Sequence, residues 1–85
     1  MAKIVIYSTA YCPYCIRAKA LLDQKEVIYE EVRVDQQPIL RREMMERSGG
    51  RQSVPQIFID NKHIGGCDEL LALDRQAALD PLLSN

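Results

Sequence analysis

The sequence predicts an α/β fold in which a four-stranded mixed sheet carries helices on both faces. Three observations support this fold class: a short β-branched run near the N-terminus, two helical segments that each begin with proline, and two short strands around a polar turn. The chain has 85 residues, of which 47% are hydrophobic and 27% charged, as is typical of one small globular domain. We therefore expect residues 1–85 to form a single domain with the order β-α-β-α-β-β-α.

The first strand and the first helix follow one another closely. Residues 3–7 read KIVIY, a nearly continuous apolar run of the kind found in strands that are buried on both faces. Pro13 suits the first position of a helix, because the N–H that proline lacks has no helical partner there. Residues 13–24 are rich in alanine, leucine, arginine and lysine, which favour a helix.

A second strand and a second helix follow. Residues 27–34 alternate tolerably well between apolar and polar positions. One face of this expected strand carries Ile28, Val32 and Val34. A βαβ crossover is right-handed and joins parallel strands, so the first two strands should be parallel. Pro38 suits the start of the second helix, and Gly49 and Gly50 suit its end.

The C-terminal third predicts a hairpin and a last helix. Residues 56–60 and 63–66 flank the polar pair Asn61 and Lys62, which predicts an antiparallel hairpin with its turn at these two residues. Residues 67–83 place leucines at helical spacing and have acidic residues in the first turn. We expect one final helix over this segment.

Charge and cysteine content limit the possible functions. A formal net charge of −1 gives no general attraction for nucleic acid or for an anionic membrane, so we expect neither as a partner. The N-terminal apolar run is too short for a secretory signal, and no segment approaches a transmembrane span, so we expect a cytoplasmic protein. Structural disulfides are rare in the cytosol, and the odd count of three cysteines also argues against a disulfide framework.

Cys12 and Cys15 form a CxxC motif that can be a structural disulfide, half of a metal site or a working redox pair. The expected compartment disfavours the disulfide. A zinc site could be imagined from Cys12, Cys15, His63 and Cys67, but the second half of that set is split by a glycine pair between a strand and a helix. The redox pair is the favoured interpretation.

The position of the motif gives its two cysteines unequal roles. Cys12 stands immediately before Pro13, where the unpaired N–H groups and the positive end of the helix dipole favour a thiolate. Cys15 lies one turn further along nearly the same face, close enough for a disulfide with Cys12 yet expected to be less exposed. We therefore expect Cys12 to be the attacking nucleophile and Cys15 the resolving thiol.

Other residues could complete a binding site near this pair. Tyr14 can offer a ring and a hydroxyl at the rim, and Gly65 and Gly66 allow the N–H groups of a helix start to approach an anion. Cys67 is read as a small buried hydrophobe or, alternatively, as a secondary thiol that modulates activity. The bond before Pro55 is an X–Pro bond, and only about 5–6% of such bonds are cis, so local sequence favours trans.

Several blocks of this sequence together resemble the glutaredoxin family, in particular its small bacterial dithiol class. In chain order they are CPYC at 12–15, RAKALL at 17–22, SVPQIFID at 53–60, HIGGCDEL at 63–70 and LDPLL at 79–83. CxxC alone is common, but these blocks in this order and spacing are specific. The resemblance implies a thioredoxin-like fold, a monomer, glutathione as co-substrate with no tightly bound cofactor, and reduction of protein disulfides and glutathionylated proteins.

The resemblance also implies where glutathione binds. In the family the proline at the position of Pro55 follows a cis bond and presents the backbone of the preceding residue, here Val54, to the ligand. Other family positions near the ligand correspond to Tyr14, Arg51, Ser53, Gly66, Cys67 and Asp68. Relatives often carry a lysine where this chain has Thr9, and Arg51 and Lys19 are the candidate substitutes.

A binding module is the alternative to an enzyme. Some relatives bridge two protomers with an iron–sulfur cluster held by the first cysteine and glutathione. Pro13 disfavours this by resemblance, because cluster-binding members tend to lack a proline after that cysteine. A glutathione-ligated iron–sulfur module or a zinc-binding module is therefore the second hypothesis.

Overall fold

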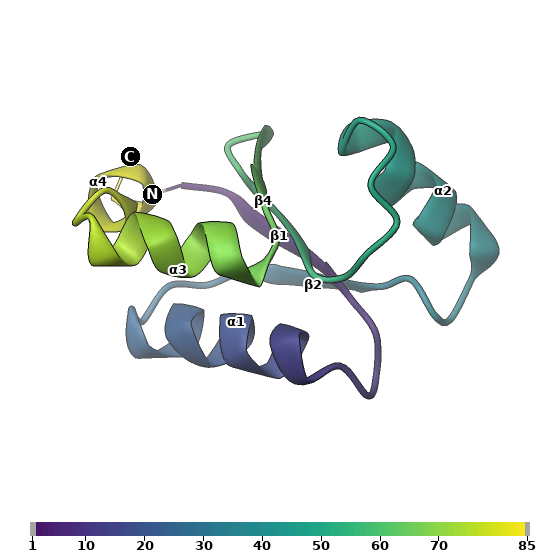
Figure 1. The fold of residues 1–85 in the computed structure, drawn as a ribbon, viewed down its shortest axis with the longest axis horizontal. Coiled ribbons are helices and arrows are strands. Elements are labelled where there is room, and N and C mark those ends of the chain that lie inside the picture. The colour runs from purple at the N-terminus through teal and green to yellow at the C-terminus, as the bar shows by residue number, and fades with distance from the viewer. Residues whose placement is uncertain (1, 85) are drawn as a thin grey trace.

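The computed structural model describes residues 2–84 as one sheet with helices around it (Figure 1). The elements are β1 (Ile4–Ser8), α1 (Pro13–Gln24), β2 (Glu30–Arg33), α2 (Pro38–Arg47), β3 (Gln56–Ile59), β4 (Lys62–Gly65), α3 (Cys67–Arg75) and α4 (Leu79–Leu83). The strand order is β2-β1-β3-β4, with β1 parallel to β2 and the other two pairs antiparallel. The mixed four-stranded sheet expected from the sequence is confirmed.

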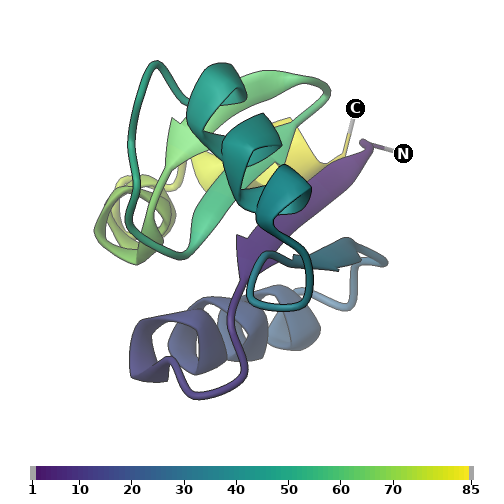
Figure 2. The same ribbon diagram turned by 90° about the vertical axis from the view of Figure 1, so that its right-hand side faces the viewer.

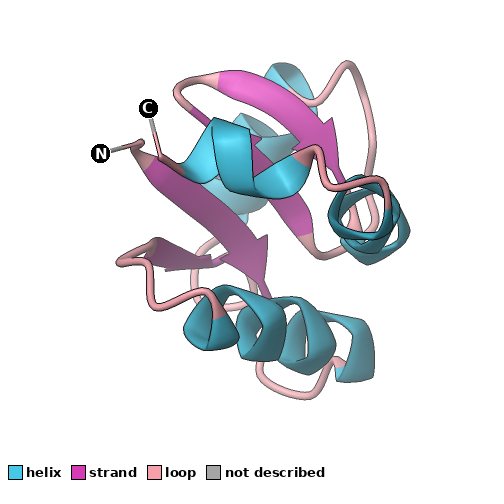
Figure 3. Ribbon diagram, turned by 90° about the vertical axis from the view of Figure 1, so that its left-hand side faces the viewer, coloured by secondary structure: helices cyan, strands magenta, loops and turns pink. Residues whose placement is uncertain are grey.

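The strands divide their side chains between two helical layers. Figure 2 shows α1 on one side of the sheet and α2 on the other, and Figure 3 shows the strands among the helices from the opposite direction. On the α1 side, Ile4 and Ile6 of β1 belong to a core cluster with residues of α1, α3 and α4. On the α2 side, Val5 and Tyr7 pack with Met44. Because successive side chains of a strand point to opposite faces, β1 contributes to both cores.

β2 is shorter than the sequence pattern predicts. Its pairing with β1 begins at Glu30, which lies opposite Val5. Val32 and Val34 pack into the α2-side core as expected. Ile28 precedes the first paired residue and is 81% exposed, so its expected place on the same buried face is wrong.

The turn of the β3–β4 hairpin lies one residue earlier than expected. Asp60 and Asn61 take left-handed backbone conformations, with φ angles of 52° and 67°. These two residue types tolerate such angles better than most. Lys62, which we had expected in the turn, is instead the first residue of β4.

The final helical segment is interrupted. α3 ends at Arg75, and α4 begins at Leu79 after a turn in which Ala77 has a φ of 59°. Pro81 accounts for the break, because it has no N–H to donate to the carbonyl of Ala77 but is tolerated in the first turn of a new helix. The expectation of one continuous helix over residues 67–83 is therefore wrong. Within residues 2–84, no helix combines the length and the apolar character needed to cross a bilayer.

Candidate active site

Cys12 occupies the N-cap of α1, as the sequence predicts. Its backbone is extended, with φ −128° and ψ 105°, and Pro13 is the first residue of the helix. The backbone N–H of Cys15 donates to the Cys12 Sγ at 3.1 Å. One of the otherwise unpaired N–H groups at the helix start is thus aimed at the sulfur.

Cys15 differs sharply from Cys12 in its surroundings. Its side chain is fully buried, whereas Cys12 retains 7% exposure, which confirms the expected difference. Burial and hydrogen bonding to Cys12 raise the pKa of Cys15 to about 12, although a backbone contact from Thr9 and the charge of Lys19 act in the opposite direction. Cys15 is therefore a protonated thiol at neutral pH.

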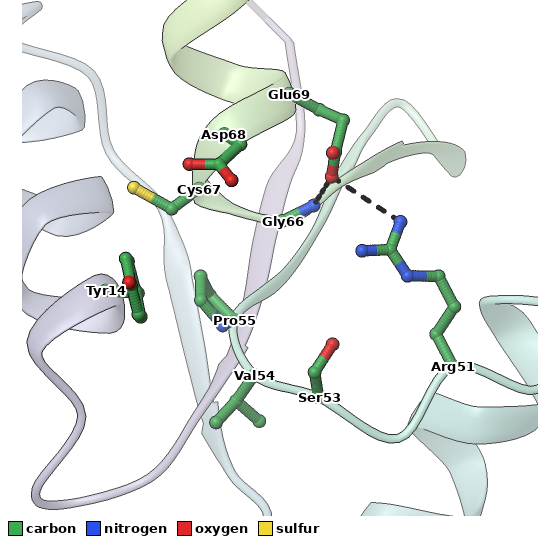
Figure 4. Close-up of a pocket in the computed structure, with 9 residues that line it drawn as sticks. All are labelled: Tyr14, Arg51, Ser53, Val54, Pro55, Gly66, Cys67, Asp68 and Glu69. Atoms are coloured by element: carbon green, nitrogen blue, oxygen red, sulfur yellow. Dashed lines mark hydrogen bonds and ion pairs between the residues drawn. The ribbon is translucent and has the colours of Figure 1, made fainter.

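A pocket of about 180 Å³ lies next to this pair (Figure 4). Its lining residues come from α1, the segment before β3, and the start of α3. They are Tyr14, Arg51, Ser53, Val54, Pro55, Gly66, Cys67, Asp68 and Glu69. The structure thus brings together every residue to which the family resemblance gave a glutathione contact, and it adds Glu69.

The segment before β3 connects the pocket to the nucleophile. The Cys12 Sγ lies 3.8 Å from the carbonyl oxygen of Val54, within weak hydrogen-bonding distance of the thiol. The Val54–Pro55 peptide bond is cis, as the resemblance implies and local sequence does not. In Figure 4, Tyr14 and Arg51 stand at opposite ends of the pocket, with Val54 and Pro55 between them.

The start of α3 forms the facing wall. The Gly66 N–H donates to Glu69 Oε1 at 2.5 Å, so Glu69 caps the helix that Gly66 opens. This bond, followed by the nearby charge of Arg51, lowers the pKa of Glu69. Gly65 has a φ of +121°, and a Cβ at this position would collide with the Glu69 carboxyl group. Glycine at position 65 therefore allows the Glu69 carboxylate to reach the N–H of Gly66 at the start of α3.

The two cations considered as substitutes for the family lysine have different positions. Arg51 lines the pocket, and its Nη1 lies 3.5 Å from Glu69 Oε1, with both side chains nearly half exposed. Such an exposed pair is weak, so its charges stay available to a ligand. Lys19 instead pairs with Glu31 at 2.9 Å and is not among the lining residues.

Glu69 is the lining residue that the sequence reasoning missed. The available signal was its position three residues after the helix cap, where glutamate commonly completes a capping box. The cap here is Gly66 rather than serine or threonine, so the usual pattern is absent.

The remaining candidate ligands do not assemble. Cys67 is 4% exposed, which confirms its reading as a small buried residue, and burial raises its pKa. Among residues 2–84, no group of three or more His, Cys, Asp or Glu side chains is placed to hold a metal ion. The zinc set imagined from Cys12, Cys15, His63 and Cys67 is therefore not formed.

Comparisons with known proteins identify the family of the chain. The glutaredoxin family model matches residues 4–64. Glutaredoxin 3 of Escherichia coli is 57% identical over 83 residues, which cover 98% of this chain and 99% of that protein. Glutaredoxin 1 of Rickettsia prowazekii is 54% identical over 83 residues, with coverage of 96% and 87%.

Solved structures show the same fold. A buckwheat glutaredoxin–glutathione complex superimposes with a TM-score of 0.89 at 35% identity, covering 98% of this chain and 77% of that one. The glutaredoxin of Brucella melitensis superimposes with a TM-score of 0.83 at 51% identity, covering 95% of this chain and 87% of that one. The thioredoxin-like fold implied by the resemblance is thus confirmed. The chain belongs to the glutaredoxin family of thiol–disulfide oxidoreductases.

Proposed function

We propose that this glutaredoxin reduces protein disulfides and glutathione mixed disulfides, with glutathione as co-substrate and no tightly bound cofactor. The observation that carries the proposal is the position of the Cys12 sulfur, 3.8 Å from the Val54 carbonyl that lines the charged pocket. The buckwheat relative with a matching fold has been solved as a complex with glutathione, which supports the same ligand here.

The pocket is chemically complementary to glutathione, which carries two carboxylates and one ammonium group. The Arg51 guanidinium and the N–H groups at the start of α3 suit carboxylates. The carboxylates of Asp68 and Glu69 suit the ammonium group. The backbone of Val54, which lines the pocket, suits the peptide bonds of the ligand, whose sulfur would then lie near Cys12.

For a glutathionylated protein, Cys12 alone is sufficient. Its thiolate attacks the glutathionyl sulfur, a Cys12–glutathione disulfide forms, and the substrate sulfur leaves as a thiolate that takes up a proton. The thiolate of a second glutathione then attacks the glutathionyl sulfur. Glutathione disulfide forms, and the Cys12 thiolate is released.

For a protein disulfide, both cysteines take part. Cys12 opens the substrate disulfide and forms a mixed disulfide with one of its sulfurs. Cys15 loses its proton as it attacks the Cys12 sulfur, and the second substrate thiol is released. Two glutathione molecules then reduce the Cys12–Cys15 disulfide and become glutathione disulfide. Because the pKa of Cys15 is raised, its attack depends on proton transfer, for which the departing substrate thiolate is a suitable acceptor.

We further propose that residues 1–85 act as one monomeric domain in the cytoplasm. Reducing compartments keep thiols such as Cys12 and Cys15 available for repeated exchange.

Two serine variants test the roles of the cysteines. We expect Cys12→Ser to abolish glutathione-dependent reduction of a glutathionylated peptide, whereas Cys15→Ser keeps much of it. Both variants should fail to reduce a protein disulfide by the two-cysteine route. Rates are followed by the oxidation of NADPH through glutathione reductase. A glutathionylated peptide that is reduced by Cys12→Ser but not by Cys15→Ser would contradict the assignment.

A further inference from the structure

The segment that enters the pocket is held by side chains at three consecutive carbonyl groups. Ser48 Oγ donates to the carbonyl of Arg51 at 3.2 Å, and Arg41 Nη1 donates to that of Gln52 at 3.0 Å. Gln56 Nε2 donates to the carbonyl of Ser53 at 3.0 Å. These bonds fix a segment that would otherwise have few partners for its backbone.

Of these three donor side chains, that of Gln56 lies nearest in sequence to the residues that line the pocket. Its side chain has no exposed surface, yet all its polar groups have partners. Nε2 also donates to Ser53 Oγ at 3.3 Å, and Oε1 lies 2.7 Å from His63 Nε2. Because the Ser53 carbonyl only accepts, the NH₂ group of Gln56 must face it. Oε1 then faces His63, whose Nε2 must carry the hydrogen.

His63 is itself held in place. It belongs to β4, and its ring centroid lies 5.0 Å from that of Phe58 in β3. Burial, together with the nearby charge of Arg51, lowers the pKa of His63, so the ring is neutral at neutral pH. A chain of hydrogen bonds therefore runs from His63 through Gln56 to Ser53. Of these three residues, only Ser53 lines the pocket.

This chain of bonds determines what Ser53 offers a ligand. Its Oγ accepts a hydrogen from Gln56, so its own hydrogen must point elsewhere. In Figure 4 the Ser53 side chain rises toward the pocket between Val54 and Arg51. The hydroxyl is thus prepared to donate to an anionic group, and the held carbonyl fixes the peptide that precedes Val54.

We propose that Gln56 is a positioning residue for glutathione recognition: oriented by His63, it holds Ser53 and the Val54 backbone in the form that a glutathionyl group requires. This inference rests on the glutathione site proposed above and concerns residues that do not touch the ligand. Loss of the Gln56 donor should weaken the preference for glutathionyl disulfides and leave the attack by Cys12 intact.

The test compares two mixed disulfides of one peptide, with glutathione and with cysteamine, which lacks the carboxylates and peptide bonds. Gln56→Glu keeps the size of the side chain but removes the donor to Ser53. Gln52→Glu makes the same chemical change at an exposed position in the same segment and is the matched control. His63→Phe keeps an aromatic ring beside Phe58 but removes the donor that orients Gln56, and it carries the test if the new carboxylate prevents folding.

The main readout is the ratio of kcat/KM for the glutathionyl peptide to kcat/KM for the cysteaminyl peptide. We expect Gln56→Glu and His63→Phe to lower this ratio at least about fivefold, since a buried carbonyl or amide loses its partner. Gln52→Glu should keep it within about twofold of wild type. Alkylation of Cys12 by iodoacetamide should proceed at the wild-type rate in all three variants.

Each other outcome contradicts the proposal. A wild-type ratio in both Gln56→Glu and His63→Phe would show that the bond chain does not position the site. An equal loss with both peptides, together with slower Cys12 alkylation, would show a general structural role instead. A wild-type enzyme that does not distinguish the two peptides would overturn the glutathione site itself, and the inference with it.

Discussion

The two sides of the active site are built in different ways. Cys12 and Cys15 lie one turn apart at the start of a single helix, so their geometry is local. The facing wall joins residue 51 and residues 53–55 to residues 66–69, which the antiparallel pairing of β3 with β4 brings together. The reactive side therefore depends on a helix terminus, whereas the recognition side depends on tertiary structure.

Under the proposed function, one side supplies the chemistry and the other the selectivity. Changes at the start of α1 should alter the reactivity of the thiols directly. Changes in the wall should alter which disulfides are accepted, because Gly65, Gln56 and Glu69 shape the pocket without reacting.

The largest expected effect concerns the labelling of the two cysteines. With the pKa of Cys15 raised to about 12, only about one Cys15 in 10⁴ is ionised at about pH 8. Iodoacetamide should therefore label Cys12 and leave Cys15 unlabelled, as located by fragment mass spectrometry. Labelling of Cys15 should rise as the pH approaches 12. The protein unfolded in urea is the control, in which both react; equal labelling in the folded protein would contradict the unequal roles.

A smaller effect is expected for a substitution of Gly65, the last residue of β4, which lies against Glu69. Gly65→Ala should lower the free energy of unfolding by about 2–3 kcal/mol, because the backbone is strained and the new Cβ displaces Glu69. It should also lower kcat/KM for a glutathionylated peptide. Gly50→Ala is the control: its φ is also positive, at +96°, but no atom lies within 4 Å of the added Cβ. Its cost should be about 1–2 kcal/mol, with kcat/KM unchanged.

The Gly65 prediction fails if the two alanine variants behave alike. Equal losses of stability and activity would mean that contact with Glu69 does not matter. Chemical denaturation and steady-state kinetics on the same protein samples distinguish the cases.

The smallest expected effect is on the pH dependence of stability and concerns Glu31, which pairs with Lys19 of α1. A hydrogen bond from the buried Ser8 hydroxyl and the ion pair with Lys19 lower the pKa of Glu31. The folded state thus favours ionised Glu31, and this stabilisation is present above the unfolded pKa of about 4.3 and lost as the pH falls through the lower folded value.

Glu31→Gln should therefore lose less stability than wild type between about pH 6 and pH 3 in urea denaturation. Glu30→Gln, in the same strand, removes a carboxylate that makes neither of these two bonds and is the matched control. The glutathionyl preference of Glu31→Gln should be unchanged, because Glu31 does not line the pocket. An unaltered acid sensitivity would contradict the assigned bonds.

The reactive side was largely predictable from the sequence. Pro13 indicates the helix start, and the positions of the two cysteines follow from it. Sequence signals were less reliable for the bounds of helices and turns where two signals conflicted. The leucines of the last segment favour one helix, but Pro81 and the left-handed Ala77 end it. The hairpin turn was misplaced because Asp60 shares the left-handed tolerance of Asn61.

The recognition side could be named only by family resemblance. Local sequence favoured a trans bond before Pro55 and gave Glu69 no role. The contact between His63 and Gln56 was not predicted either. That contact depends on the register of β3 against β4, which includes an irregularity at Ile57 and Phe58. Register of this kind is set by the whole fold and not by either strand alone.

The most direct test of the central claim locates the glutathionyl group. Cys15→Ser protein is converted to the Cys12–glutathione disulfide, and its amide ¹H–¹⁵N shifts are compared with those of the same variant carrying cysteamine on Cys12. The account predicts that the largest differences fall at residues 51–54 and 66–69. Differences that are absent there, or that concentrate on α2 or β2 instead, would contradict it.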